Sequence, residues 1–102
     1  MFIMFYITNP NRAVAKKVAT RLLNKKLIAC ANVLPIADSM YRWKGRVKNT
    51  QEWALIAKTS SKKANAVEAE IRKIHPYEIP CIIKLSAKAN NAFEQWLKGE
   101  LI

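Results

Sequence analysis

The residues best suited to chemistry lie in one short segment, His75-Pro76-Tyr77-Glu78-Ile79-Pro80-Cys81. It contains the only histidine of the chain, together with a phenol, a carboxylate and a thiol. These groups close together suit proton transfer or the binding of a soft metal ion such as copper. The structural alternative is a helix end, where a histidine caps the last carbonyls and suits the helix dipole. On spacing alone, we favour this structural interpretation.

Four other side chains are candidates for binding. Lys58 stands late in a predicted strand, where a lysine usually reaches solvent and less often binds an anion. Tyr41 and Trp43 alternate near a predicted hairpin tip, and Trp53 lies on the other arm. Such aromatics could stack on nucleic-acid bases, but we favour a contact with a neighbouring subunit.

Several kinds of site are excluded by what the sequence lacks. The chain has two glycines, so it cannot form a glycine-rich phosphate loop. It contains no H-E-x-x-H zinc motif and no nucleophile elbow. Because no nucleophile and base form a recognisable pair, we expect a protein that is not an enzyme.

Composition favours a single cytoplasmic domain, residues 1–102. The apolar run at the start is too short for a signal peptide or a membrane span, so we expect neither. The two cysteines are not in a C-x-x-C pattern, and reduced thiols are the default interpretation. The net charge of +11 is spread along the chain without a basic run, so we expect no nucleic-acid partner.

The first half of the chain predicts a strand, a helix and a long hairpin. Phe2–Thr8 is an apolar strand, after which Asn9 and Pro10 look like the cap and first residue of a helix that continues to about Lys26. The hairpin arms are Leu27–Lys44 and Val47–Thr59. Pro35 indicates a bulge or an edge position in the first arm, and Lys44-Gly45-Arg46 is a plausible turn.

The second half predicts a helix, a strand and a short final helix. Ser60 or Ser61 caps the second helix, whose apolar face is Ala64, Val67, Ile71 and Ile74 and which must end before Pro76. The strand is Ile79–Leu85. The final helix begins with an Asn91–Glu94 capping box and docks through Phe93, Trp96 and Leu97.

This order, β-α-β-β-α-β plus a terminal helix, is the split βαβ arrangement of the ferredoxin-like α+β fold, an antiparallel sheet with two helices on one face. Each hairpin arm is longer than the usual strand of about 5–6 residues, so the hairpin should extend beyond the helices. An overhanging apolar ribbon with free edges invites pairing with another chain. The pattern therefore predicts an oligomer built by strand pairing.

Ordered motifs along nearly the whole chain resemble the CutA divalent-cation-tolerance proteins. They are Ala29-Cys30-Ala31-Asn32-Val33-Leu34-Pro35, Ser39-Met40-Tyr41-Arg42-Trp43-Lys44-Gly45, Ala57-Lys58-Thr59, His75-Pro76-Tyr77-Glu78-Ile79-Pro80 and Trp96-Leu97. The resemblance implies a homotrimer of ferredoxin-like subunits joined through the hairpin, similar in architecture to nitrogen-regulatory (PII-type) signalling proteins. It also implies an association with copper and other divalent metals.

The resemblance also assigns expected roles to individual residues. It implies a subunit cleft lined by Lys58, Tyr77, Tyr41 and Trp43. Together with the residues themselves it leads us to expect metal ligands at His75 and Cys81, with Cys30 or Glu78 as further ligands. It implies a trimer interface that includes Trp53, Trp43 and Tyr41. The sequence departs from the family at Cys81, where an acidic residue is usual, and at Lys44, where glutamate or glutamine is usual. Since a thiol replaces a carboxylate, a soft ion such as Cu(I) is favoured.

Three functional hypotheses follow from these observations. The first is a trimeric protein that binds copper or another divalent metal in a cleft between subunits. The second is a PII-like sensor of a small molecule or anion bound near Lys58 and Tyr77, or a trimeric scaffold with no metal role. The third is a basic nucleic-acid-binding protein, which the scattered charge disfavours.

Overall fold

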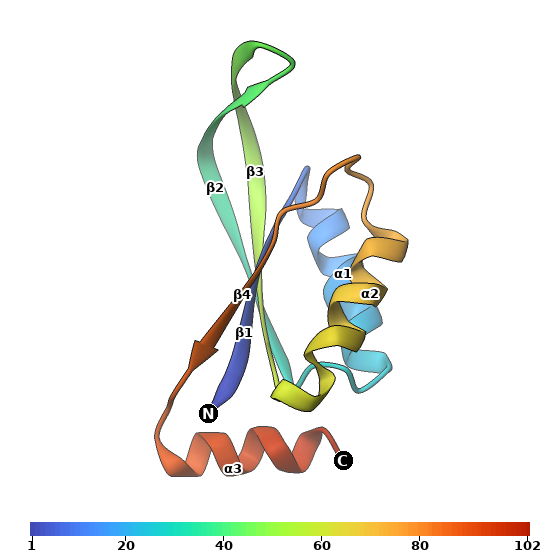
Figure 1. The fold of residues 1–102 in the computed structure, drawn as a ribbon, viewed down its shortest axis with the longest axis vertical. Coiled ribbons are helices and arrows are strands. Elements are labelled where there is room, and N and C mark those ends of the chain that lie inside the picture. Colours follow the sequence, from blue (N-terminus) through green and yellow to red (C-terminus); the bar gives the residue numbers. More distant parts are fainter.

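A four-stranded antiparallel sheet with strand order β2-β3-β1-β4 forms the centre of the computed structural model, which describes residues 1–102 (Figure 1). The order of elements is βαββαβα and confirms the predicted ferredoxin-like fold. None of the helices combines the length and apolarity needed to cross a membrane. The strands are β1 Phe2–Asn9, β2 Cys30–Trp43, β3 Arg46–Thr59 and β4 Ile82–Ala87, and the helices are α1 Arg12–Asn24, a 3₁₀ turn at Ser61–Lys63, α2 Ala64–Ile74 and α3 Asn91–Glu100.

The main hydrophobic core lies between one face of the sheet and helices α1 and α2 (Figure 1). Phe5 and Ile7 of β1 point into it, and Leu22 and Ile71 supply the facing helix side chains, all without exposure to solvent. Burying each such side chain contributes roughly 1.5–3 kcal/mol. The predicted apolar face of α2 is therefore confirmed, with Ala64, Val67 and Ile71 buried and Ile74 partly buried beside them.

An ion-pair cluster joins the two core helices near the surface. Glu70 of α2 lies 3.0 Å from both Arg21 Nε and Lys25 Nζ of α1. These two cations, with the Lys25 hydrogen bond the larger effect, lower the pKa of the Glu70 carboxyl. The cluster fixes how α2 lies on α1 and so sets where the chain leaves α2 at His75.

Helix α3 forms a separate, smaller core at the end of the sheet near both termini (Figure 1). Leu97 and Leu101 pack on Phe2, with Phe93 and Met4 beside them. The predicted docking face is correct for Phe93 and Leu97. Trp96 is 45% exposed and lies at its margin.

The β2–β3 hairpin extends well beyond the helices, as the length of its arms predicted (Figure 1). Trp43 pairs with Arg46, so the loop is the two residues Lys44 and Gly45. Both have positive φ, 51° and 79°, as a type I′ turn requires. This backbone matches the twist of the arms, and glycine adopts it without steric cost.

A β-bulge interrupts β2 in the middle of the hairpin. Ile36 pairs with Glu52 and Ser39 with Thr50, so β2 advances three residues while β3 advances two. The preceding Pro35 is accommodated because β2 is an edge strand and needs no amide donor on its outer side. Before the bulge, even-numbered residues of β2 such as Ile36 point to the sheet face that Glu52 shares. Beyond the bulge, odd-numbered residues such as Tyr41 point to that same face.

The second face of the sheet is left open by the helices over much of its area. Leu34, Ile83 and Leu85 point to this face and are 44%, 43% and 48% exposed. Tyr6 lies between Ile56 and Ile83 in the same cross-strand row. A row of partly exposed apolar side chains across a whole sheet is typical of a surface that another protein covers.

The start of α1 differs from its predicted position. The helix is capped by Asn11, whose Oδ1 accepts a hydrogen bond from the Val14 amide at 2.8 Å. Asn9 instead ends β1 with its side chain fully buried, and Pro10 precedes the cap. Asparagine is favoured as a helix cap at either position. The local sequence does not indicate that Asn9 instead bonds Trp53 and His75, which lie far along the chain.

Smaller differences occur at three other boundaries. Neither Ser60 nor Ser61 caps α2 through its side chain, because a 3₁₀ turn precedes the helix. The cap of α3 is Asn90, which makes no side-chain cap bond, and Glu94 accepts from the Ala89 amide at 2.9 Å, so the predicted Asn91–Glu94 capping box is wrong. Strand β4 begins at Ile82, because Ile79 and Pro80 belong to the preceding loop.

Candidate functional site

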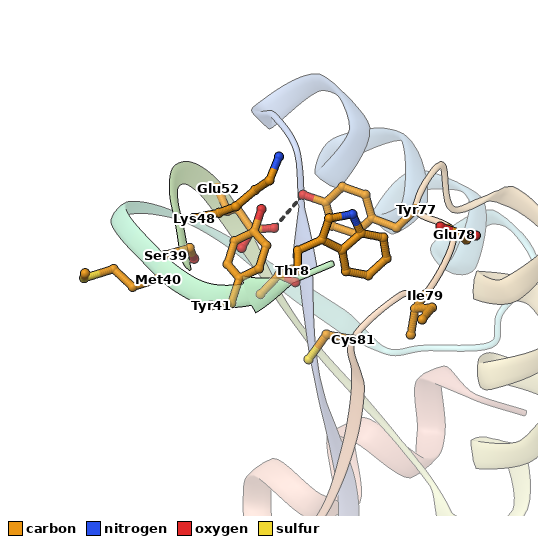
Figure 2. Close-up of a pocket in the computed structure, with 11 residues that line it drawn as sticks. Thr8, Ser39, Met40, Tyr41, Lys48, Glu52, Tyr77, Glu78, Ile79 and Cys81 are labelled. Atoms are coloured by element: carbon orange, nitrogen blue, oxygen red, sulfur yellow. Dashed lines mark hydrogen bonds between the residues drawn. The ribbon is translucent and has the colours of Figure 1, made fainter. Parts of the chain in front are cut away.

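One pocket of about 450 Å³ lies between the upper part of the hairpin and the loop that follows α2 (Figure 2). The hairpin and the loop are far apart in sequence, and β1 lies between them. The pocket is large enough for a small ligand. Its lining residues are Thr8, Ser39, Met40, Tyr41, Trp43, Lys48, Glu52, Tyr77, Glu78, Ile79 and Cys81.

A hydrogen bond between Tyr77 and Glu52 closes one side of the pocket (Figure 2). The phenol of Tyr77 donates to Glu52 Oε2 at 2.5 Å and thus links the loop to β3. Burial and then the adjacent Glu52 raise the pKa of Tyr77 above its usual range, so the phenol keeps its proton. Tyr77 therefore acts as a neutral donor to a carboxylate that is only 7% exposed.

The loop that carries Tyr77 is held in place by the ring of His75. Helix α2 ends at His75, whose φ and ψ of −77° and 135° are extended, as expected before Pro76. The ring lies 4.9 Å from that of Tyr77 in an edge-to-face arrangement. Its Nδ1 accepts a hydrogen bond from the Tyr77 amide at 3.2 Å.

The other ring nitrogen of His75 binds the end of β1. Nε2 lies 2.9 Å from the Thr8 carbonyl oxygen and 3.1 Å from Asn9 Oδ1. A carbonyl oxygen only accepts, so Nε2 carries the proton and Nδ1 is the acceptor. Asn9 in turn donates through Nδ2 to the Ile7 and Trp53 carbonyls. This buried network joins β1, β3 and the loop, and it uses both nitrogens of a neutral imidazole.

The protonation of His75 should make stability depend on pH. Burial lowers the pKa of His75, despite opposing effects of the Thr8 carbonyl and Glu52. The unfolded chain therefore binds the proton more readily, and the free energy of unfolding should fall as pH drops through about 6.5. His75→Gln should flatten this dependence in urea unfolding between about pH 7.5 and pH 5.5. An unchanged slope in the variant would contradict the role given to His75.

The proposed metal ligands do not come together within one chain. No group of three or more histidine, cysteine, aspartate or glutamate side chains is placed to hold a metal ion. Cys81 and Glu78 both line the pocket, but His75 is occupied by the network described above. Cys30 lies on β2, where it pairs with Lys58 of β3, and Cys81 directly precedes β4 at the other edge of the sheet. Because β3 and β1 lie between them, Cys30 and Cys81 are separated by on the order of 15–20 Å.

The proposed cleft residues divide into two groups. Tyr77, Tyr41 and Trp43 line the same pocket within one chain. Lys58 lies elsewhere, because its ammonium donates to Asn32 Oδ1 at 3.2 Å and sits 5.6 Å from the centre of the Phe93 ring. Trp53 points to the opposite face of β3 from Glu52, and its carbonyl oxygen accepts a hydrogen bond from Asn9 Nδ2.

The sequence interpretation missed Glu52, Asn9, Thr8 and Lys48. Glu52 carries a weak signal, because it occupies a strand position directly before the apolar run Trp53-Ala54-Leu55. Asn9 resembled a helix cap, and its contacts with His75 span 66 residues. Thr8 and Lys48 are ordinary strand residues, and only the folded arrangement brings them to the pocket.

Comparisons with known proteins agree on one family. The family model described as "CutA1 divalent ion tolerance protein" matches residues 3–100. The "Divalent-cation tolerance protein CutA" of Thermotoga maritima is 39% identical over 101 residues, which cover 98% of this chain and 99% of that protein. The "Protein CutA homolog" of Xenopus laevis is 39% identical over 98 residues, and the match spans 95% of this chain but only 64% of that protein.

A solved structure gives the same result for the fold. The structure described as the periplasmic divalent cation tolerance protein CutA of Archaeoglobus fulgidus superposes with a TM-score of 0.95. It is 36% identical, and the match covers 100% of both chains. The whole chain, including the overhanging hairpin and α3, thus has a counterpart in a known structure.

Proposed function

Since the chain belongs to the CutA1 divalent ion tolerance family, we propose that it acts in tolerance of divalent cations as a homotrimer that binds copper or another soft metal ion in a cleft between subunits. The observation that carries the proposal is the shared pocket of the Cys81 thiol and the Glu78 carboxylate. Both belong to the loop before β4, an edge strand of the sheet. A site at this edge is within reach of a neighbouring subunit.

The open sheet face and the hairpin support the trimer. Leu34, Ile83 and Leu85 form an apolar surface that the helices leave uncovered. Met40 and Val47, on the opposite face of the hairpin, are 69% and 64% exposed. Both edge strands, β2 and β4, have free hydrogen-bonding groups. Free edges next to an apolar face favour assembly with further copies of the chain.

The donor set of one chain is incomplete for a metal ion. A soft metal ion prefers thiolate ligands, and Cys81 supplies one, while Glu78 adds a weaker oxygen donor. His75 could join only if its ring left the Thr8 carbonyl and the Tyr77 amide. We therefore propose that Cys81 is the principal ligand and that a second subunit supplies the missing donors. Cys30 would have to come from such a subunit.

Titration of the reduced protein with Cu(I), using a competing chelator of known affinity, tests the metal site. Cys81→Ser should weaken Cu(I) binding at least tenfold, because the thiolate is lost from the donor set. Cys30→Ser removes the other thiol and should weaken binding only if Cys30 of a neighbouring subunit is one of the missing donors, so this variant tests that assignment. His75→Gln should leave the affinity nearly unchanged, because its ring is already bonded.

Other outcomes of the same titration separate the competing assignments. Equal affinities for the wild type and Cys81→Ser would remove the proposed site. A large loss in His75→Gln would assign the histidine as a ligand and require the network to open. Absence of any Cu(I) binding would favour the scaffold interpretation.

A sensor of small anions is less consistent with the pocket. The pocket contains the carboxylates of Glu52 and Glu78 against the single ammonium of Lys48. Lys58, the residue assigned to an anion from the sequence, lies outside it. We propose a cytoplasmic location, in which both unpaired cysteines stay reduced. Fractionation of cells tests this, since one solved relative is described as periplasmic.

A further inference from the structure

Glu52 is a buried carboxylate without a counter-charge. The residue is 7% exposed, yet no ammonium or guanidinium nitrogen of the chain lies within 4.0 Å of its oxygens. Its only hydrogen bond within the chain is the one from the Tyr77 phenol to Oε2. Buried carboxylates are normally paired with a cation, because removal of the charge from water is costly. The second oxygen, Oε1, has no partner within the chain and is not itself buried, so it is open to a ligand.

The pocket is locally acidic within a strongly basic chain. The net charge is +11, and the chain has only seven acidic residues. Three of them, Glu68, Glu70 and Glu94, are neutralised by ion pairs. Two of the remaining four, Glu52 and Glu78, line this pocket. The pocket is therefore a place where a cation gains electrostatic energy on an otherwise repulsive surface.

Aromatic rings form much of the remaining wall. Tyr41, Trp43 and Tyr77 come from the hairpin and the loop, and all three line the pocket. Figure 2 shows the side chains of Tyr41 and Tyr77 on either side of the Glu52 carboxylate. Faces of aromatic rings attract cations through their quadrupole, most strongly where water is excluded. Rings around a carboxylate are suited to an organic cation whose alkyl part also needs an apolar contact.

We infer that this pocket binds a small organic monocation, with an ammonium or guanidinium headgroup on Glu52 Oε1 and its alkyl part against Tyr41, Trp43 and Tyr77. The volume of about 450 Å³ is sufficient for such a ligand. The binding is distinct from the proposed metal site, because Glu52 and the aromatic residues are not among its ligands. It also does not depend on that site being correct.

Two cations of the chain could compete with a ligand: Lys44, whose Nζ lies 5.8 Å from the centre of the Trp43 ring, and Lys48, the only cation among the lining residues. Lys48 pairs with Tyr41 across the hairpin, but its ammonium makes no ion pair with any carboxylate. The side chain is exposed. Lys48 therefore repels a bound cation more than it neutralises Glu52, and its removal should strengthen binding.

The test is a titration of the reduced protein with n-butylammonium and n-butylguanidinium, with n-butanol as the neutral comparison. EDTA is present throughout, so failure of the metal proposal cannot affect the result. Binding is followed by the NMR signals of the three tryptophan indole N–H groups, and Trp43→Phe identifies the signal from the pocket. We expect saturable shifts of the Trp43 signal with both cations and none with n-butanol.

Two variants with opposite expected effects make the test specific. Glu52→Gln keeps an acceptor for Tyr77 but loses the charge, so the affinity for both cations should fall at least tenfold. Lys48→Gln, at an exposed position, should raise the affinity two- to fivefold. Glu100→Gln changes the net charge as Glu52→Gln does, but it lies at the end of α3 and should have no effect.

Several outcomes would overturn the inference. One is a wild-type protein that shows no saturable shift of the Trp43 signal, which would mean that a side chain of a neighbouring subunit already fills the pocket. Another is equal binding by the wild type and Glu52→Gln. If Glu52→Gln does not fold, the Lys48→Gln variant decides. An affinity of Lys48→Gln for the two cations that is unchanged or weaker than that of the wild type would contradict the inference.

Discussion

Replacing Asn9 with leucine is expected to lower the free energy of unfolding by roughly 3–4 kcal/mol. The side chain is fully buried and makes three hydrogen bonds, to the Ile7 and Trp53 carbonyls and to His75 Nε2. Leucine has a similar size but offers no donor or acceptor. The Ile7 and Trp53 carbonyls and the His75 ring would each lose a hydrogen bond in a buried site, and each such loss costs about 1–1.5 kcal/mol. The loss is a large part of the 5–15 kcal/mol typical of a whole domain.

The measurement is urea unfolding at one fixed protein concentration, because assembly adds to the apparent stability. Asn65→Leu is the control, since Asn65 lies exposed on α2 and makes no side-chain hydrogen bond. It should change the free energy of unfolding by less than about 0.5 kcal/mol. A loss below about 1 kcal/mol for Asn9→Leu would show that water or a shift of β1 replaces the lost bonds.

A single carboxylate on the open sheet face is expected to convert the proposed trimer into separate chains. Ile83 lies opposite Tyr6 in the middle of the uncovered apolar surface. Ile83→Glu would bury an unpaired charge in each interface, at a cost of several kcal/mol for every ion. In a closed symmetric trimer the change occurs once in each subunit, so the cost is repeated. Light scattering should then report the mass of one chain.

Ser86→Glu provides the matched control for this substitution. It lies on the same strand and adds the same charge, but its partner Ile3 packs toward the main core on the other face of the sheet. The control should keep the mass of the wild type. A wild-type protein that is monomeric, or an Ile83→Glu variant that stays trimeric, would contradict the assignment of the open face as the interface.

Elements with strong local patterns could be predicted from the sequence. The helix faces at Val18, Leu22, Val67 and Ile71 follow from spacing, and the two long arms around Lys44-Gly45 follow from alternation and turn chemistry. The helix caps were less accurate, because several asparagines and serines near each helix start satisfy the same preference. Tertiary contacts decide which of them is used.

The site could be predicted only in part, for a physical reason. Tyr77, Glu78 and Cys81 of the segment singled out in the sequence line the pocket, whereas His75 lies outside its lining. The role of His75 could not be inferred, because its partners Thr8 and Asn9 lie more than 60 residues away in sequence. Glu52 is a candidate site residue because it is buried beside Tyr77 in the folded chain, and no local sequence pattern predicts that contact.

The bulge between Ile36 and Ser39 has a consequence for how the pocket could change in evolution. The extra residue at Ala37-Asp38 shifts the alternation of β2, so that Tyr41 and Trp43 face the same side as Glu52. The same strand paired without the bulge, at unchanged length, would instead turn Met40 and Arg42 to that side. The pocket would then lose the walls made by Tyr41 and Trp43 and gain the fixed positive charge of Arg42, with no substitution at any lining position. The bulge is therefore a determinant of ligand preference.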